Sequence, residues 1–194
     1  MKKEARLQVL ITEALLCAIG IAIPLFCPKI VIGPASFTLA SHVPVFLAMF
    51  ISPAAAVTVS LGTTLGFLVA GFHPVVVLRA LSHIVFALVG SLWLRKAPGV
   101  LSSVKGMALF SVAVSVLHAA CEVVVVTFFF FGNQLSKETY QSGYFIGVLL
   151  LVGLGGMVHS MIDFGISLAV WKPVSHTVRF PVSIRHIFPN AERA

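Results

Sequence analysis

The chain has 194 residues, of which 59% are hydrophobic and 10% are charged, and its formal net charge is +7. Soluble domains carry about 25% charged residues, so the composition excludes an ordinary water-soluble domain and predicts a bundle embedded in a lipid bilayer. The net charge does not indicate nucleic-acid binding, because the basic residues lie at the boundaries of apolar runs. We expect one transmembrane domain spanning residues 1–194.

Apolar runs along the chain predict an all-α membrane protein with six transmembrane helices. Their expected bounds are 7–27, 37–52, 54–72, 74–94, 104–131 and 143–171. Pro53 and Pro74 support two of the starts, because proline suits the first turn of a helix. Residues 28–36 are apolar for an outer loop. Two interpretations of this loop stay open: a lid that folds back on the protein, and a short structured connection.

The distribution of Lys and Arg predicts the orientation in the membrane. Ten of the 13 basic residues lie at the two ends of the chain or between residues 95 and 105. Lys29 and Lys137 lie in the loops of the opposite side, and Arg79 lies inside a predicted span. Loops rich in Lys and Arg stay on the cytoplasmic side, so both termini are expected in the cytoplasm.

A stripe of small residues follows the first predicted helix. Ala14, Ala18 and Ala22 recur every four residues, which places them on one helix face. Small side chains at this spacing let another helix approach closely. The stripe therefore predicts a helix contact, either within the protein or with a docking partner.

Three predicted helices each carry two polar residues spaced four apart, and this spacing places both on one face. The pairs are Arg79 with His83, His118 with Glu122, and His159 with Asp163. Ionisable groups in hydrocarbon cost ~2.5–3.5 kcal/mol on insertion scales, so they must face protein, water or a ligand. The first two pairs lie in the outer half, where they could line an outward-facing pocket. For His159 and Asp163 a structural network is favoured.

Other residues near the outer surface complete the expected binding site. Lys29, Asn133 and Tyr144 lie at or beside the outer loops and could contribute to the pocket mouth. A cap or kink of the second helix is favoured for His42. One His and one carboxylate per helix is a weak metal signal, so no metal site is predicted. The sequence contains no P-loop, HExxH or GxSxG motif, so no catalytic role and no cofactor of its own are expected.

Over essentially its whole length the chain resembles the substrate-binding S components of energy-coupling factor (ECF) vitamin importers of lactic-acid bacteria. The alanine stripe, the segment 36–53 and the stretch 78–83 carry the resemblance, together with the six apolar runs. It implies a vitamin pocket built from spans four to six and closed by the loop between the first two spans. It also implies a bacterial cell membrane and non-catalytic transport. The implied partners are a transmembrane coupling subunit docked on the stripe and two ATPase subunits, which use ATP and Mg²⁺.

The ligand does not follow from the fold alone. Cobalamin is slightly favoured, because the outer halves of spans four to six offer few concentrated charges. Niacin comes next, with Arg79 as the partner of its carboxylate. The competing function is a stand-alone proton-coupled transporter that uses residues of spans five and six as a relay. The lack of a visible inverted repeat argues against it. An intramembrane metal-dependent enzyme is the third and weakest interpretation.

Overall fold

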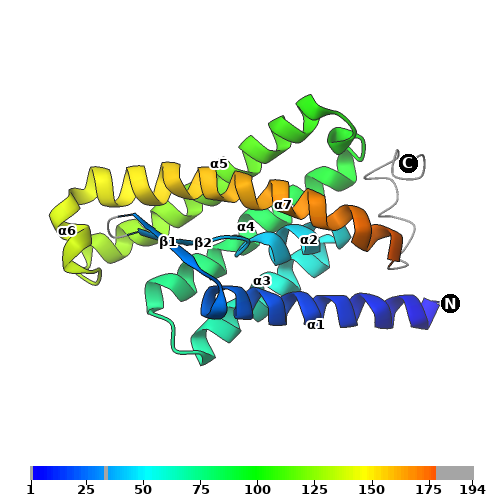
Figure 1. Ribbon diagram of the computed structural model, residues 1–194, viewed down its shortest axis with the longest axis horizontal. Helices are drawn as coiled ribbons and strands as arrows, with labels where there is room; N and C mark the ends of the chain where they lie inside the picture. Colours follow the sequence, from blue (N-terminus) through cyan, green and yellow to red (C-terminus); the bar gives the residue numbers. More distant parts are fainter. Residues whose placement is uncertain (1, 33–34, 178–194) are drawn as a thin grey trace.

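The computed structural model describes residues 2–32 and 35–177, and it is a helical bundle with one small β-hairpin (Figure 1). The elements in chain order are α1 (Lys2–Phe26), β1 (Lys29–Ile32), β2 (Ala35–Thr38), α2 (Val43–Ile51), α3 (Pro53–Val69), α4 (Pro74–Lys96), η1 (Val100–Ser102), α5 (Val104–Phe131), α6 (Lys137–Tyr144), η2 (Phe145–Gly155) and α7 (Gly156–Thr177). The two strands are antiparallel, and Lys29 lies opposite Thr38.

Four described helical stretches are long and apolar enough to cross a membrane. They are Arg6–Phe26, Pro74–Lys96, Val104–Phe131 and Lys137–Val174. α3 is apolar but shorter, with 17 residues. These helices make the chain a multi-pass membrane protein, and the number of six crossings stays a prediction.

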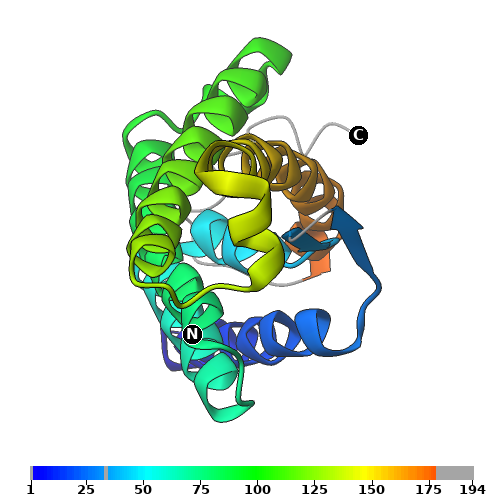
Figure 2. The ribbon, with the colours of Figure 1, turned by 90° about the vertical axis from the view of Figure 1, so that its left-hand side faces the viewer.

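The second predicted span, 37–52, is wrong as a continuous membrane helix. β2 takes up Phe37 and Thr38, and α2 contains only nine residues. A helix of this length extends about 14 Å, whereas the hydrocarbon core is about 30 Å thick. Every residue of α2 is buried. Figure 2 shows α2 (cyan) in the middle of the bundle, so its apolar side chains form protein core rather than a lipid-facing surface.

Local signals explain why α2 is short. His42 is its N-cap residue, and Pro44 lies in its first turn. At the other end, the extended backbone of Ser52 (φ −170°, ψ 161°) ends α2. The Ser52 hydroxyl then accepts a hydrogen bond from the amide of Ala55 and caps α3. One serine thus divides a continuous apolar run into two helices.

The end of the chain forms one long helical path with a break near its start. Gly143 has φ 74° and ψ 167°, values outside the helical region, at the residue where the sixth span is predicted to begin. Before this break, α6 folds across one end of the bundle (Figure 2). After it, η2 and α7 continue to Thr177.

The two ends of the bundle differ in charge. The start of α1, the connection from α4 to α5 and the end of α7 lie at one end, and α6 lies at the other (Figure 1). The first end holds Arg6, Arg95, Lys96, Lys105 and Lys172. Lys137 belongs to α6, at the opposite end. This arrangement agrees with the asymmetry on which the predicted orientation depends, although Arg179, Arg185 and Arg193 lie outside the described residues.

Aromatic side chains pack around α2 and form the centre of the core. Phe46 and Phe164 lie with ring centroids 5.4 Å apart, and Phe50 and Trp171 lie at the same separation. Phe46 and Phe50 are fully buried. The packed core therefore encloses α2.

Candidate functional site

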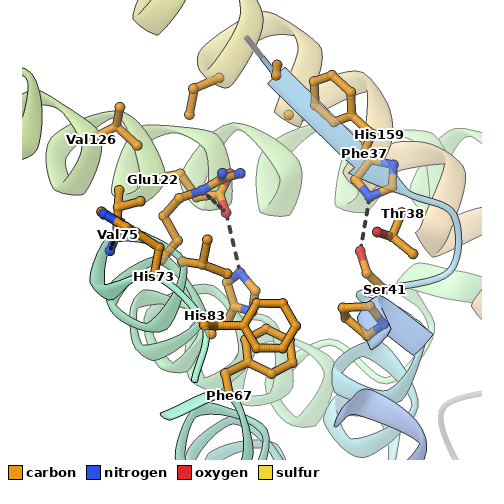
Figure 3. A pocket seen from close by; sticks show the side chains of 18 of the residues that line it. Phe37, Thr38, Ser41, Phe67, His73, Val75, His83, Glu122, Val126 and His159 are labelled. Carbon is orange, nitrogen blue, oxygen red and sulfur yellow. Dashed lines mark hydrogen bonds and ion pairs between the residues drawn. The ribbon is translucent and has the colours of Figure 1, made fainter. Parts of the chain in front are cut away.

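A cavity of about 660 Å³ lies beyond the N-terminal end of α2 (Figure 3). Its wall includes the end of α1, the β-hairpin, the start of α2, and parts of α3, α4, α5, η2 and α7. The connection from α5 to α6 and α6 itself also contribute. This volume is within the range of small-molecule pockets.

Four of the seven predicted binding residues line the cavity. They are Lys29, Arg79, His83 and Glu122. The other three do not belong to its wall. His118 lies fully buried behind it, Tyr144 makes a hydrogen bond to the Thr127 hydroxyl at 2.9 Å, and Asn133 has a left-handed backbone (φ 57°) just after the C-cap of α5.

Arg79 and Glu122 form a two-point ion pair between α4 and α5. The Arg79 Nε atom donates to Glu122 Oε1 at 3.0 Å, and Nη2 donates to Oε2 at 2.9 Å. The partner of Arg79 therefore comes from another helix. A guanidinium has five N–H donors, so three remain available. The side chain of Arg79 is 28% exposed and lines the cavity, so these donors can serve a ligand.

Asp163 joins α7 to the start of α2. One carboxylate oxygen accepts a hydrogen bond from the amide of Ala40 at 2.8 Å. The other accepts from the amide of His42 and from its Nδ1 atom, both at 2.9 Å. His159 contacts the Ser41 hydroxyl at 3.1 Å. These contacts satisfy a buried carboxylate and hold the hairpin at the cavity, which agrees with the structural network expected for this pair.

His42 is the main residue that the sequence interpretation undervalued. It occupies the N-cap position of α2, but its side chain makes no capping hydrogen bond. Its ring lies between those of His83, His118 and His159, with centroids 4.6–5.0 Å away. The one signal in the sequence was a polar ring placed directly before an apolar run, where a buried polar contact can form. The rings come together because α2 begins in the middle of the bundle.

Two described sets of side chains could hold a metal ion. The first contains His42, His83, His118 and Glu122, and the second contains His42, His159 and Asp163. Within each set, one donor atom of every residue lies within 4.8 Å of the others. The sequence predicted no metal site, because one His and one carboxylate per helix is a weak signal, and the other donors of each set come from elements distant in the sequence.

The rest of the cavity wall is largely apolar and aromatic. Phe67 and Phe72 stack with centroids 4.6 Å apart, and Phe37 of the hairpin lies 5.6 Å from the ring of His159. Phe37 and Lys29 place the hairpin against the cavity. The described part of residues 28–36 is thus a structured segment beside the cavity, residues 33–34 lie outside the described residues, and a lid role stays a prediction.

Comparison with known proteins shows the family to which the chain belongs. No family model matches the chain, and no solved structure matches it. The chain is 42% identical over 183 residues to the niacin transporter NiaX of Lactococcus lactis subsp. cremoris (strain MG1363), and the match covers 94% of this chain and 80% of that protein. The chain is an S component of the ECF vitamin importers. This identity confirms the family that the sequence resembles.

The name of the relative can be compared with the two vitamins expected from the sequence. Its name specifies niacin, which was the second expectation. The preference for cobalamin finds no support. That preference depended on a lack of concentrated charge, whereas the structure brings Arg79, Glu122 and several imidazoles to one place.

The alanine stripe of the S component lies on the outside of α1. Ala14 and Ala18 are exposed, and Ala22 is half-buried. α1 packs on α3 through another face, where Gly20 lies close to the Thr63 side chain. The internal contact that was one interpretation of the stripe therefore does not involve Ala14 and Ala18.

Proposed function

We propose that this S component captures niacin in the cavity beyond α2 and delivers it through an ATP-driven partner complex. The observation that carries the proposal is the 42% identity, over 94% of this chain, to a protein named as a niacin transporter. The cavity volume of about 660 Å³ is ample for a single pyridine ring. Cobalamin is far larger than a drug-sized ligand and would fill or exceed it.

The groups on the wall match the chemistry of nicotinate. Its carboxylate is an anion, and the three remaining N–H donors of Arg79 suit hydrogen bonds to both carboxylate oxygens. Lys29 adds a second cation from the hairpin. The flat pyridine ring fits beside Phe37 and Phe67, which line the same cavity. Its ring nitrogen is an acceptor that the Ser41 hydroxyl or an imidazole N–H can reach.

The hairpin acts as the lid in this proposal. Its two strands are short, and the side chains of β1 are exposed. Its second strand ends beside Ala40 and His42, whose amides are held by Asp163. A hairpin that moves about this anchored end would allow entry from outside without disturbing the core around α2.

Docking on the coupling subunit uses the exposed alanine stripe in this proposal. Ala14 and Ala18 would let a partner helix approach closer than the usual 8–10 Å between helix axes. Two ATPase subunits, with ATP and Mg²⁺, would supply the energy. The proposed topology has six crossings and both termini in the cytoplasm. The basic residues gathered at one end of the bundle support this orientation.

The test is a titration of the purified chain, without partners, against nicotinate, nicotinamide and cobalamin. We expect nicotinate to bind below the micromolar range without nucleotide, and cobalamin not to bind. Failure of nicotinate to bind in this range would overturn the proposal. Uptake into proteoliposomes that contain the chain alone, driven by a pH gradient, would instead support the proton-coupled transporter.

A further inference from the structure

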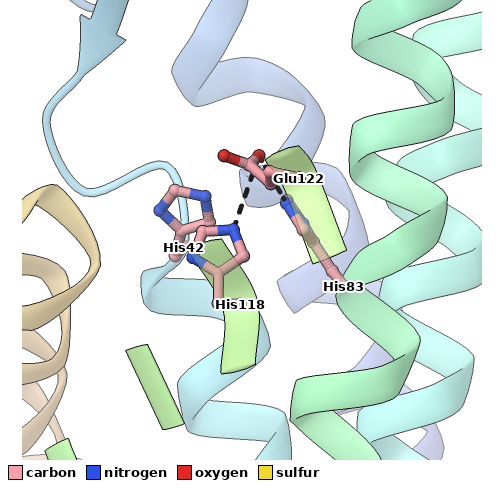
Figure 4. Close-up of side chains that lie close together, drawn as sticks. All are labelled: His42, His83, His118 and Glu122. Carbon is pink, nitrogen blue, oxygen red and sulfur yellow. Dashed lines mark ion pairs between the residues drawn. The ribbon is translucent and has the colours of Figure 1, made fainter. Parts of the chain in front are cut away.

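Three imidazoles and one carboxylate converge at the inner wall of the cavity. His42 comes from the start of α2, His83 from α4, and His118 and Glu122 from one face of α5 (Figure 4). His42, His118 and Glu122 are buried, and the side chain of His83 is 11% exposed. One donor atom of each lies within 4.8 Å of the others. These are the donor types that zinc and similar ions prefer.

Several donor atoms of this cluster have no hydrogen-bond partner. Among the described residues, the buried atoms without one include Nε2 of His83 and both ring nitrogens of His118. An unsatisfied buried polar atom costs about 1–3 kcal/mol, and such atoms in a native structure call for an explanation. Bound metal would use the lone pairs of both Nε2 atoms.

The distances fit a coordination shell better than a hydrogen-bond network. The Nε2 atoms of His83 and His118 lie 3.5 and 3.4 Å from Glu122 Oε1, without hydrogen-bond geometry. A tetrahedral ion with Zn–N bonds of ~2.0–2.1 Å separates its ligand atoms by about 3.3 Å. The ring centroids of His42, His83 and His118 lie 4.6–5.0 Å apart. The four donors thus lie near a common point, and binding one ion requires the wider separations within the 4.8 Å limit to shorten.

The groups behind these donors hold them in the form that metal binding requires. Asp163 accepts from Nδ1 of His42 at 2.9 Å, which leaves Nε2 of this ring with a free lone pair. Arg79 holds both oxygens of Glu122 and keeps the carboxylate ionised in position. A carboxylate or other acceptor behind a ligating histidine is a regular feature of protein metal sites.

We propose that His42, His83, His118 and Glu122 bind a divalent transition-metal ion of the zinc type. The site would adjoin the cavity, because three of the four residues line it. With neutral imidazoles, the charges of Arg79 and Lys29 balance those of Glu122 and Asp163 around the cavity. A divalent ion would make the net charge positive, which suits an anionic carboxylate. This last point alone depends on the proposed function.

The test begins with the whole chain, purified in detergent with an affinity tag that contains no His or Cys. The protein is treated with a chelator, loaded with Zn²⁺ or Co²⁺, desalted and analysed for metal content. We expect about one ion per chain. The Co²⁺ form should show visible absorption of a tetrahedral site, and X-ray absorption should report only N and O ligands, at ~2.0–2.1 Å for Zn²⁺. If the reloaded protein retains no ion, the proposal is wrong.

Variants locate the ion. His118→Asn and His83→Asn should each lower Zn²⁺ affinity roughly tenfold or more, since the loss even of an outer-shell partner costs ~10–100-fold. His73→Asn is the matched control, because His73 also lines the cavity but lies outside the cluster. Wild-type affinity in both cluster variants would place the ion elsewhere and overturn the assignment.

Two further measurements separate misfolding from loss of the metal, and failure of the metal site from failure of the proposed function. His118 is fully buried, so its variant is checked for folding by thermal unfolding in the presence of chelator. His83, at the cavity wall, provides the second variant if His118→Asn does not fold. Metal content is measured without any vitamin, and vitamin binding is measured with and without metal. A chain that binds Zn²⁺ but not nicotinate would refute the proposed function while supporting the metal site.

Discussion

Removing the positive charge of Arg79 should destabilise the protein and lower its affinity for nicotinate. In Arg79→Met, Glu122 keeps its charge but loses the guanidinium that contacts both of its oxygens at 2.9–3.0 Å. Glu122 is 2% exposed, so water cannot replace the lost partner. Breaking a fully buried ion pair in this way costs about 3–5 kcal/mol.

The expected loss is somewhat smaller here, because the side chain of Arg79 is 28% exposed and its pairing is partly screened. We expect about 2–4 kcal/mol of unfolding free energy. For a chain of this size, each kcal/mol shifts Tm by about 2–4 °C, so Tm should fall by about 4–16 °C. Thermal unfolding in detergent measures this shift. Chelator is present throughout, so that bound metal does not contribute.

A double variant tests the reason for the loss. Arg79→Met combined with Glu122→Gln leaves no unpaired charge at this position, and should therefore be more stable than Arg79→Met alone. Lys29→Met is the matched control, because Lys29 is also a cation at the cavity but is exposed. Its Tm should stay close to that of wild type. If the double variant is no more stable than Arg79→Met, the lost stability does not come from an uncompensated carboxylate.

Arg79→Met should affect the binding of nicotinate and of nicotinamide differently. A hydrogen bond to a charged group contributes about 1.5–3 kcal/mol, so Arg79→Met should weaken nicotinate binding roughly 10- to 150-fold. Nicotinamide lacks the carboxylate charge and should lose much less. Isothermal titration of both compounds gives the ratio. Equal losses for the two would mean that Arg79 shapes the cavity without contacting a carboxylate.

Three other substitutions test separate parts of the molecule. Ala18→Trp should abolish uptake in cells that contain the partner subunits while leaving vitamin binding intact. Ile19→Trp, exposed on α1 but about 100° around the helix from Ala18, should transport normally. Gly62→Val should lower stability by about 1–3 kcal/mol, measured as Tm, because an added Cβ would collide with the Cys17 sulfur and separate α1 from α3. Asp163→Ala should lower both Tm and vitamin affinity, since three donors at the end of the hairpin lose their acceptor, at about 1–3 kcal/mol per group.

The parts of the fold that follow from local chemistry were predictable from the sequence. α5 covers Val104–Phe131, the same residues as the fifth predicted span, and α4 begins at Pro74 as expected. Proline, hydrophobic run length and four-residue spacing act within one helix, and no other part of the chain is needed to interpret them. They also place His118 and Glu122 on one face of α5.

The depth of α2 could not be predicted in this way. A core helix enclosed by other helices and a helix facing lipid have the same apolar composition, so the composition of residues 43–51 did not show that they are buried in protein. The one sign was that the predicted span 37–52 is shorter than the ~20 residues that a crossing needs. The hairpin had a stronger signal, since a run of β-branched residues at 30–32 precedes Gly33 and Pro34, a turn sequence. In a chain this apolar, that signal is easily overlooked.

The pairing of the site residues depends on tertiary structure alone. Arg79 meets Glu122 across two helices, and His42 meets Asp163 across more than a hundred residues. Spacing along one helix shows which face a residue occupies, but not which residue lies opposite. The spacing therefore placed the polar pairs of α4, α5 and α7 on shared helix faces, while the ion pair, the role of His42 and the imidazole cluster required the fold.

The short α2 explains why the cavity, the hairpin and the polar cluster share one location. A full second span would fill the centre of the bundle at every depth, whereas α2 begins at Val43 and leaves the space beyond it open. The chain that would have continued the helix instead forms the hairpin, whose residues line that space. The start of α2 also brings His42 to the polar side chains of α4, α5 and α7. Lengthening α2 at its N-terminal end would therefore remove the cavity, the lid anchor and the imidazole cluster together, while the exposed stripe on α1 would remain.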